Sequence, residues 1–220
     1  MTDVAAALAE VRERIAAAAR GAGRHPDAVR LVAATKTVPP ERVAEAVALG
    51  VADVGENRAQ ELLAKAEAFD QRPPATTEAV CWHFLGRLQR NKVRSLASRV
   101  TWWQSVDREP LGTAIARHAP GARVLVEVNL AGESQKGGCA PGDAARLADA
   151  LRQAGLRVEG LMTIPPAADD PRPWFAALRE LAGELGAPEL SMGMTDDFEA
   201  AIAEGATMVR IGRAIFGARA

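Results

Sequence analysis

Tyrosine is absent from this 220-residue sequence, and lysine is scarce. The absence of tyrosine excludes that side chain as a catalytic base. Of the 27 basic residues, four are lysines and 23 are arginines, so a lysine in an unusual context is easy to find. The four are Lys36, Lys65, Lys92 and Lys136.

Cysteine and histidine are also rare. Cys81 and Cys139 form no CxxC pair and no metal-spaced cluster, which predicts two buried or half-buried free thiols. The three histidines are scattered along the chain and form no ligand cluster, so no metal site is predicted. They are His25, His83 and His118.

The sequence has no excess of charge and no long apolar run. Basic and acidic residues number 27 and 28, and the net charge of −1 gives no global field that favours nucleic acid or an anionic membrane. No apolar run approaches the roughly 20 residues of a membrane span. Residues 1–20 carry acids and arginines throughout, unlike a signal peptide, so we expect a cytoplasmic protein.

The hydrophobic pattern alternates between short apolar runs and helical periods. Val4, Leu8, Val11 and Ile15 predict an amphipathic helix over residues 2–20. Eight short apolar or β-branched runs then predict strands near 31–35, 51–54, 81–85, 100–104, 123–130, 157–162, 189–192 and 207–211. Between them lie a helix from Pro39-Pro40 to Gly50 and helical stretches near 57–69, 89–97, 108–118, 142–154, 172–185 and 196–203.

This alternation indicates a parallel sheet with right-handed crossovers. Eight units favour a closed (β/α)8 TIM barrel with an N-terminal helix, and an open doubly wound sheet is the alternative. No Gly/Ser-rich or charged linker divides the chain. We therefore expect residues 1–220 to form a single domain.

Functional residues of such a barrel gather at the carboxyl ends of the strands. Lys36 directly follows the first apolar strand. A lysine that is partly desolvated at a barrel mouth has a lowered pKa, and the neutral amine attacks aldehydes to give a Schiff base. The alternative is a lysine that ends a strand and reaches into water.

The last two strands carry a second signal. Gly212 followed by Arg213 fits the start of a short helix whose backbone N–H groups bind phosphate, and Ser191 offers a hydroxyl donor. A plain helix start is the alternative. Arg210 lies within an apolar strand and needs an acceptor, either a ligand or a structural carboxylate.

An amine, a phosphate site and an arginine around one mouth suggest a phosphorylated aldehyde. Pyridoxal 5′-phosphate (PLP) meets that description. Arg210 would donate a hydrogen bond to an unprotonated ring nitrogen, which weakens the ring as an electron sink compared with an aspartate partner.

Several segments resemble the pyridoxal phosphate homeostasis protein family, also called proline synthetase co-transcribed proteins. They are LVAATKT at 31–37, GENRAQE at 55–61, WHFLGRLQRNK at 82–92, GLMTI at 160–164 and SMGMTDDFEAAIAEGATMVRIGRAIFG at 191–217. The resemblance spans nearly the whole chain. It implies a barrel similar to the N-terminal domain of alanine racemase.

The same resemblance implies roles for individual residues. Lys36 would carry PLP as a Schiff base, Arg210 would face the pyridine nitrogen, and Asn57 of the GEN motif would lie near the cofactor. Ser191 and the backbone at Gly212 and Arg213 would hold the phosphate. Position 213 is often Thr or Ser in relatives, and position 195 is Thr where Ser is common. Lys136, in the segment SQKGG, is expected to be a solvated loop lysine, and a secondary amine near the site is the alternative.

The resemblance also implies a function. Such proteins have no established turnover and are thought to bind, buffer or deliver PLP. We therefore expect a non-enzymatic protein of intracellular PLP (vitamin B6) homeostasis, with PLP-dependent apo-enzymes as possible recipients and a monomer as the default state.

Three other functions are alternatives. The first is a PLP-dependent amino-acid racemase of low activity, which needs acid/base groups on both faces of the cofactor. Neither a second domain nor a tyrosine supplies the group on the second face. His83 is a substitute in principle. A lysine aldolase would need Glu56 or Glu127 beside Lys36. Nucleic-acid binding would use a basic stretch that is expected to be a solvated face: Arg87, Arg90, Lys92, Arg94 and Arg99.

Overall fold

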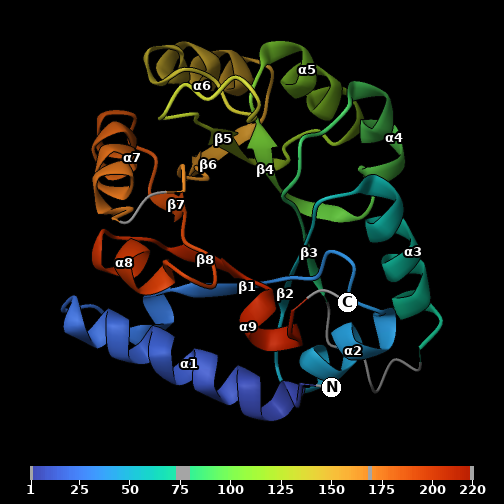
Figure 1. Ribbon diagram of the computed structural model, residues 1–220. Coiled ribbons are helices and arrows are strands. Elements are labelled where there is room, and N and C mark those ends of the chain that lie inside the picture. Colours follow the sequence, from blue (N-terminus) through green and yellow to red (C-terminus); the bar gives the residue numbers. More distant parts are fainter. Residues whose placement is uncertain (1, 73–79, 168–169, 219–220) are drawn as a thin grey trace.

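The computed structural model describes residues 2–72, 80–167 and 170–218. In it, parallel strands close into a barrel in chain order (Figure 1). The predicted (β/α)8 barrel is therefore confirmed, and the open-sheet alternative is wrong. The strands are β1 (Arg30–Ala34), β2 (Asp53–Glu56), β3 (Cys81–Phe84), β4 (Val100–Val106), β5 (Arg123–Glu127), β6 (Arg157–Met162), β7 (Glu189–Ser191) and β8 (Met208–Ile211).

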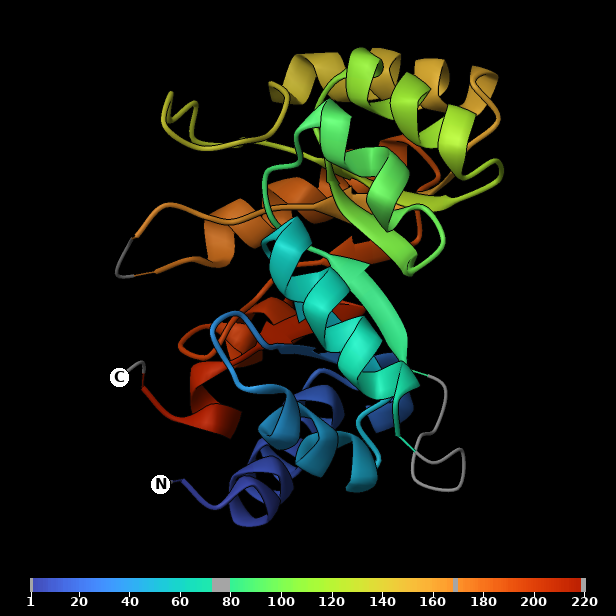
Figure 2. The same cartoon turned by 90° about the vertical axis from the view of Figure 1, so that its right-hand side faces the viewer.

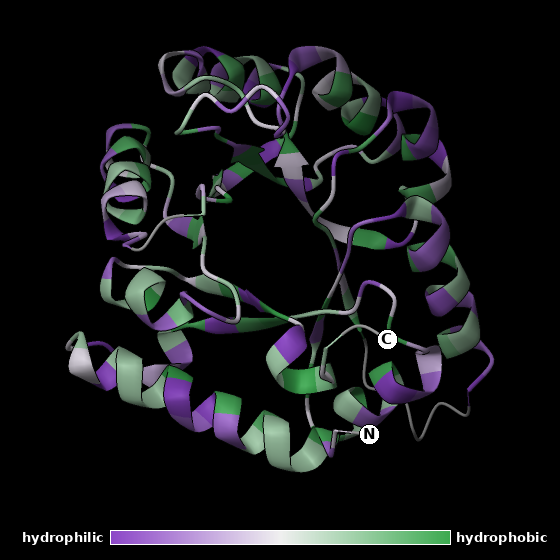
Figure 3. Cartoon of the chain, viewed as in Figure 1, coloured by the Kyte–Doolittle hydropathy of each residue, from purple (hydrophilic) through white to green (hydrophobic). Residues whose placement is uncertain are grey.

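Helices surround the barrel and alternate with its strands. The ring consists of α2 (Pro40–Ala48), α3 (Ala59–Asp70), α4 (Val93–Leu96), α5 (Glu109–His118), α6 (Ala144–Gln153), α7 (Arg172–Glu184), α8 (Phe198–Ala203) and α9 (Arg213–Phe216). In Figure 3 the hydrophilic colouring gathers on the outer sides of this ring. No helix in the described ranges is long and apolar enough to cross a membrane.

The N-terminal helix α1 (Val4–Gly21) confirms the helix predicted over 2–20. It begins at Asp3, whose carboxylate accepts hydrogen bonds from the N–H groups of Ala5 and Ala6. Its apolar stripe is buried and packs against α8 and α9. The helix lies along the lower edge of the ring in Figure 1.

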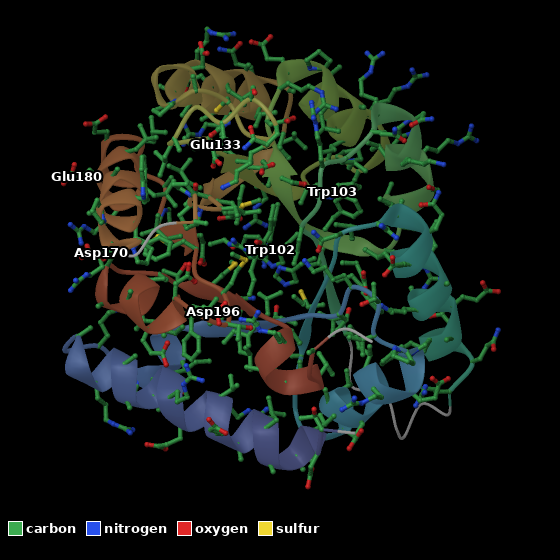
Figure 4. The ribbon with its side chains drawn as sticks, in the orientation of Figure 1. Trp102, Trp103, Glu133, Asp170, Glu180 and Asp196 are labelled. Carbon is green, nitrogen blue, oxygen red and sulfur yellow. The ribbon has the colours of Figure 1, made fainter. Side chains whose placement is uncertain are left out.

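The core has an inner and an outer layer, because successive residues of a strand face opposite sides. Trp102 belongs to the inner cluster, whereas Trp103 packs in the outer layer, between the barrel wall and the helices. Figure 4 shows Trp102 near the barrel centre and Trp103 farther out. The strand run Val124-Leu125-Val126 is buried on both faces, as its continuous apolar pattern predicts.

Some predicted boundaries are wrong. The strand predicted at 51–54 lies at Asp53–Glu56. The strand predicted over 123–130 ends at Glu127, because Asn129 forms side-chain hydrogen bonds with the backbone N–H and C=O of Glu133 that turn the chain away. The helix predicted at 89–97 is split into a 3₁₀ turn at Arg90–Lys92 and the single turn α4.

The strand ends define one functional face of the barrel. In Figure 2 the loops that follow β5 and β6 project to the same side as α9. The β1–α2 turn and the β2–α3 connection open on the same face, since all strands run parallel. We call this face the mouth and the opposite end, where the strands begin, the floor.

Candidate functional site

Lys36 lies in the turn between β1 and α2. Its neighbours are held by α3: the Thr37 N–H donates to Glu61 Oε2 at 2.9 Å, and Lys65 Nζ donates to the Thr35 carbonyl at 2.6 Å. Thr37 adopts a left-handed backbone with φ of 64°. Lys36 itself is exposed, so the partial desolvation expected from its position is not observed. The turn therefore holds Lys36 at the mouth on a backbone that is anchored on both sides.

A buried ion pair lies behind this turn. Glu56 is 0% exposed and Lys65 is 4% exposed, and the two side chains form a salt bridge. The Thr35 hydroxyl donates to the same Glu56 oxygen at 2.6 Å. Sequence reasoning missed the role of Lys65. The available signal was a lysine on a helix face that is otherwise apolar, four residues after Glu61.

Arg210 points into the barrel from β8 and is 5% exposed. Its guanidinium donates to Ser191 Oγ and to the Thr163 carbonyl, each at 2.8 Å. In the described residues these acceptors are a hydroxyl and a backbone carbonyl, and not the structural carboxylate that was one of the two alternatives for Arg210. Burial lowers the pKa of Arg210 to about 10, opposed by the charges of Glu127 and Asp197, and the group stays protonated at neutral pH.

Ser191 is fully buried at the end of β7. Its hydroxyl donates to Gln104 Oε1 at 2.6 Å and accepts from Arg210. The hydroxyl beside α9 belongs instead to Thr195, whose Oγ1 accepts from the Ala214 N–H at 3.4 Å. The residue at position 195, noted above only as a departure from relatives, therefore lies where a phosphate donor was expected.

The β8–α9 junction packs directly on the end of β1. A Cβ added to Gly212 would lie 2.6 Å from the Ala34 carbonyl oxygen, so glycine is required by this close approach. The N–H groups of Ile215 and Phe216 bond back to the Gly212 carbonyl. The N–H groups of Arg213 and Ala214 come too early in the turn for a carbonyl partner within α9, and that of Ala214 bonds to Thr195 Oγ1 instead.

Two other predicted residues have well-defined surroundings. The Arg213 side chain is 57% exposed and forms a salt bridge with Asp196. Asn57 is half-buried just after β2, and its backbone packs so closely on Gly86 that a Cβ there would lie 2.2 Å from the Asn57 carbonyl oxygen.

Glu127 adds a titratable carboxyl group to the mouth. It ends β5, is 7% exposed, and lies under Gly137 of the following loop. Burial and the charge of Asp107 raise its pKa to about 7, although Arg210 and Arg87 act in the opposite direction. Near neutral pH, this carboxyl therefore exchanges a proton close to Arg210.

Lys136 is anchored rather than solvated. Its Nζ donates to the Pro165 carbonyl at 2.9 Å and forms an ion pair with Glu133, and its side chain is 28% exposed. The prediction of a solvated loop lysine is wrong, because this lysine ties the loop after β5 to the loop after β6.

Strand register brings most of the predicted residues together. Ala34 pairs with Gly55, so Lys36 and Asn57 leave neighbouring strands at the same height. Val32 pairs with Arg210, and Gly212 contacts Ala34. Lys36, Asn57, Arg210, Gly212 and Arg213 therefore surround one corner of the mouth, with Ser191 beneath it.

The described residues also contain one group of possible metal ligands at the floor. One ligand atom each from Asp53, Cys81 and His83 lie within 4.8 Å of one another. No metal site was predicted, because spacing along the sequence does not report that the fold brings His83 beside Asp53 and Cys81. Both cysteines are half-buried free thiols, as predicted.

The fold and mouth define a barrel of the alanine racemase N-terminal domain family, whose model matches residues 7–220. The pyridoxal phosphate homeostasis protein of Pseudomonas aeruginosa is 45% identical to this chain, over 100% of this chain and 97% of the relative. The chain belongs to the pyridoxal phosphate homeostasis protein family.

Two solved structures are similar to this chain, at different levels of sequence identity. PipY of Synechococcus elongatus PCC7942, solved with PLP bound, is 32% identical with a TM-score of 0.83, covering 98% of this chain and 100% of PipY. Alanine racemase of Corynebacterium glutamicum has a TM-score of 0.70 at 17% identity. The match covers 95% of this chain and 61% of the racemase, and it shows a shared fold.

Proposed function

We propose that this protein binds PLP at the barrel mouth and takes part in intracellular PLP (vitamin B6) homeostasis. The observation that carries the proposal is one corner of the mouth where an exposed lysine, a buried arginine and the first turn of α9 meet. The likeness to PipY, which was solved with PLP bound, supports it over the full length of both chains.

In this proposal Lys36 holds PLP covalently as a Schiff base. Arg210 donates to the pyridine nitrogen, and Asn57 borders the ring. The backbone N–H groups of Gly212 and Arg213 bind the phosphate. Schiff-base formation needs an amine within reach of the aldehyde, and Lys36 follows β1 at the mouth on a turn that Glu61 and Lys65 hold.

The phosphate hydroxyl is assigned differently from the expectation. The Ser191 hydroxyl is already engaged by Gln104 and Arg210, so Ser191 serves by holding Arg210. Thr195, next to the Ala214 N–H, supplies the hydroxyl at the phosphate. The Arg213 side chain, paired with Asp196, leaves its backbone donor as the contact.

The residues proposed to surround the PLP ring favour retention of the cofactor over catalytic turnover. Bound PLP supplies an electrophilic aldehyde and an electron-withdrawing ring. Arg210 is charged and donates only, so it keeps the ring nitrogen unprotonated and limits that withdrawal. We therefore propose a binding protein of residues 1–220 without catalytic turnover.

The runner-up, racemisation, finds neither of the second acid/base groups considered for it, a tyrosine or His83, at the mouth in the described residues. The sequence holds no tyrosine, and His83, the substitute considered above, is 0% exposed and faces the barrel interior. Both its ring nitrogens are hydrogen-bonded, to Asp53 and to Gln104. The recipient apo-enzymes, the monomeric state and the cytoplasmic location stay predictions.

The proposal is tested by titrating PLP into the protein and following the absorbance of the bound chromophore. We expect saturation at one PLP per chain, loss of the covalent band in Lys36→Ala, and retention of it in the matched variant Lys92→Ala. An unchanged band in Lys36→Ala refutes the covalent assignment. Formation of D-alanine from L-alanine at enzyme-like rates refutes the absence of turnover.

A further inference from the structure

A polar chain crosses the interior of the barrel from the floor to the mouth. At the floor, Asp53 Oδ1 accepts from His83 Nε2 at 2.8 Å and lies 3.3 Å from an Arg30 nitrogen. The other ring nitrogen, His83 Nδ1, lies 2.6 Å from Gln104 Nε2. Gln104 Oε1 accepts from Ser191, which accepts from Arg210 at the mouth.

The chemistry of the partners fixes the direction of every hydrogen bond. An ionised carboxylate only accepts, so His83 Nε2 carries the proton. Nδ1 then accepts from the Gln104 amide, whose oxygen accepts from the Ser191 hydroxyl. Each donor therefore lies on the mouth side of its acceptor, from the Arg210 guanidinium down to the Asp53 carboxylate.

The charges agree with this direction. Burial lowers the pKa of His83 despite the neighbouring Asp53, so the ring is neutral and transmits polarity without adding a charge. Burial alone would raise the pKa of Asp53, but the His83 hydrogen bond and the Arg30 charge outweigh it and lower the pKa. The chain thus joins a permanent cation at the mouth to a permanent anion at the floor, with every dipole aligned.

The floor group is better explained by this chain than by a metal ion. The Asp53 oxygen is shared by His83 and Arg30. A second guanidinium, that of Arg123, lies 5.2 Å from the Trp102 ring, which itself stacks on His83. A divalent cation at Asp53 would displace the His83 and Arg30 donors and would face the fixed positive charge of Arg30.

We propose that Asp53 is a positioning residue for Arg210, acting at the opposite end of the barrel through His83, Gln104 and Ser191. Because the Asp53 carboxylate accepts the hydrogen bond at the floor, it fixes the tautomer of His83, the orientation of the Gln104 amide and the direction of the Ser191 hydroxyl. The lone pairs of the Ser191 oxygen are then available to accept from Arg210. The inference rests on the proposed function, because Arg210 is the residue assigned to the PLP ring nitrogen.

The test is a double-mutant cycle on PLP affinity. Asp53→Asn removes the floor charge, and Gln104→Met breaks the chain with a side chain of similar length. We expect Asp53→Asn to weaken PLP binding between about 2-fold and about 30-fold, and to have no further effect when Gln104→Met is present. The matched control is Glu189→Gln, a floor carboxylate that bonds Thr207 outside the chain and leaves affinity unchanged.

A second readout separates positioning from a general effect on stability. The protein has three histidines, so the ¹⁵N signals of His83 can be assigned with His83→Gln. In the wild type we expect an unprotonated Nδ1 whose shift moves when PLP binds, and no such movement in Gln104→Met. This wild-type measurement decides the question if Asp53→Asn fails to fold.

The inference is overturned if Asp53→Asn binds PLP like the wild type, if its effect persists in the Gln104→Met background, or if His83 does not respond to PLP in the wild type. A wild-type protein that takes up no PLP at all refutes the proposed function instead. The two failures are therefore distinguishable.

Discussion

The buried pair of Lys65 and Glu56 gives the most quantitative prediction. The variant Lys65→Met removes the cation and leaves Glu56, which is 0% exposed, without its counter-charge. Breaking one side of a buried ion pair costs about 3–5 kcal/mol of unfolding free energy. The variant also removes the donor to the Thr35 carbonyl, and with it one of the two attachments that hold the Lys36 turn to α3.

The assay is urea unfolding at neutral pH with and without PLP. We expect Lys65→Met to lose about 3–5 kcal/mol, and the double variant Glu56→Gln/Lys65→Met to recover part of that loss because no buried charge is left unpaired. The matched control is Lys136→Met, whose partly exposed ion pair with Glu133 predicts a loss of about 1 kcal/mol or less.

Two results refute this reasoning. A loss below about 1 kcal/mol in Lys65→Met means that Glu56 does not remain buried and charged in the variant. A double variant at least as unstable as the single one means that shape, and not the unpaired charge, dominates the loss.

Three further predictions concern the mouth. The pKa of Glu127 is about 7 in the folded state against an ordinary 4.5, so the native protein binds the proton first as pH falls. As the pH falls from 8 to 5, the unfolding free energy of the wild type should therefore rise relative to that of Glu127→Gln, by at most about 3 kcal/mol. Urea unfolding at each pH measures this difference, and a difference that does not change with pH contradicts the assignment. Gly212→Ala should lower the unfolding free energy by about 1–3 kcal/mol in thermal melts and weaken PLP binding, because the added Cβ would meet the Ala34 carbonyl oxygen. Unchanged stability and affinity would show that the β8–α9 junction accommodates the methyl group. Arg213→Ala should leave PLP affinity unchanged, since only the exposed pair with Asp196 is lost; a large loss in titration would place the side chain on the phosphate.

The sequence predicts the barrel well because its strands are short, apolar and evenly separated by helical periods. The alternation of Trp102 and Trp103 between inner and outer layers follows from strand geometry alone. Predicted strand ends are wrong where a side chain competes with strand pairing for backbone hydrogen bonds, as Asn129 does after β5. Such competition depends on a turn that hydrophobic periodicity does not report.

The site is predicted unevenly for a similar reason. Lys36 stands out because it directly follows an apolar strand, and Arg210 stands out because it lies within one. The roles of Lys65 and Gln104 depend on contacts between distant segments, Lys65 with Thr35 and Gln104 with Ser191. Ser191 was expected at the phosphate because its strand end is known from sequence, but the direction of its hydroxyl is set by Gln104, 87 residues away.

The central claim is that Lys36 holds PLP. The most direct measurement is reduction of the PLP-loaded protein with borohydride, followed by intact mass and peptide mapping. The account predicts one phosphopyridoxyl group per chain, located on Lys36 and lost in Lys36→Ala. No adduct, or a label spread over Lys65, Lys92 and Lys136, would contradict it.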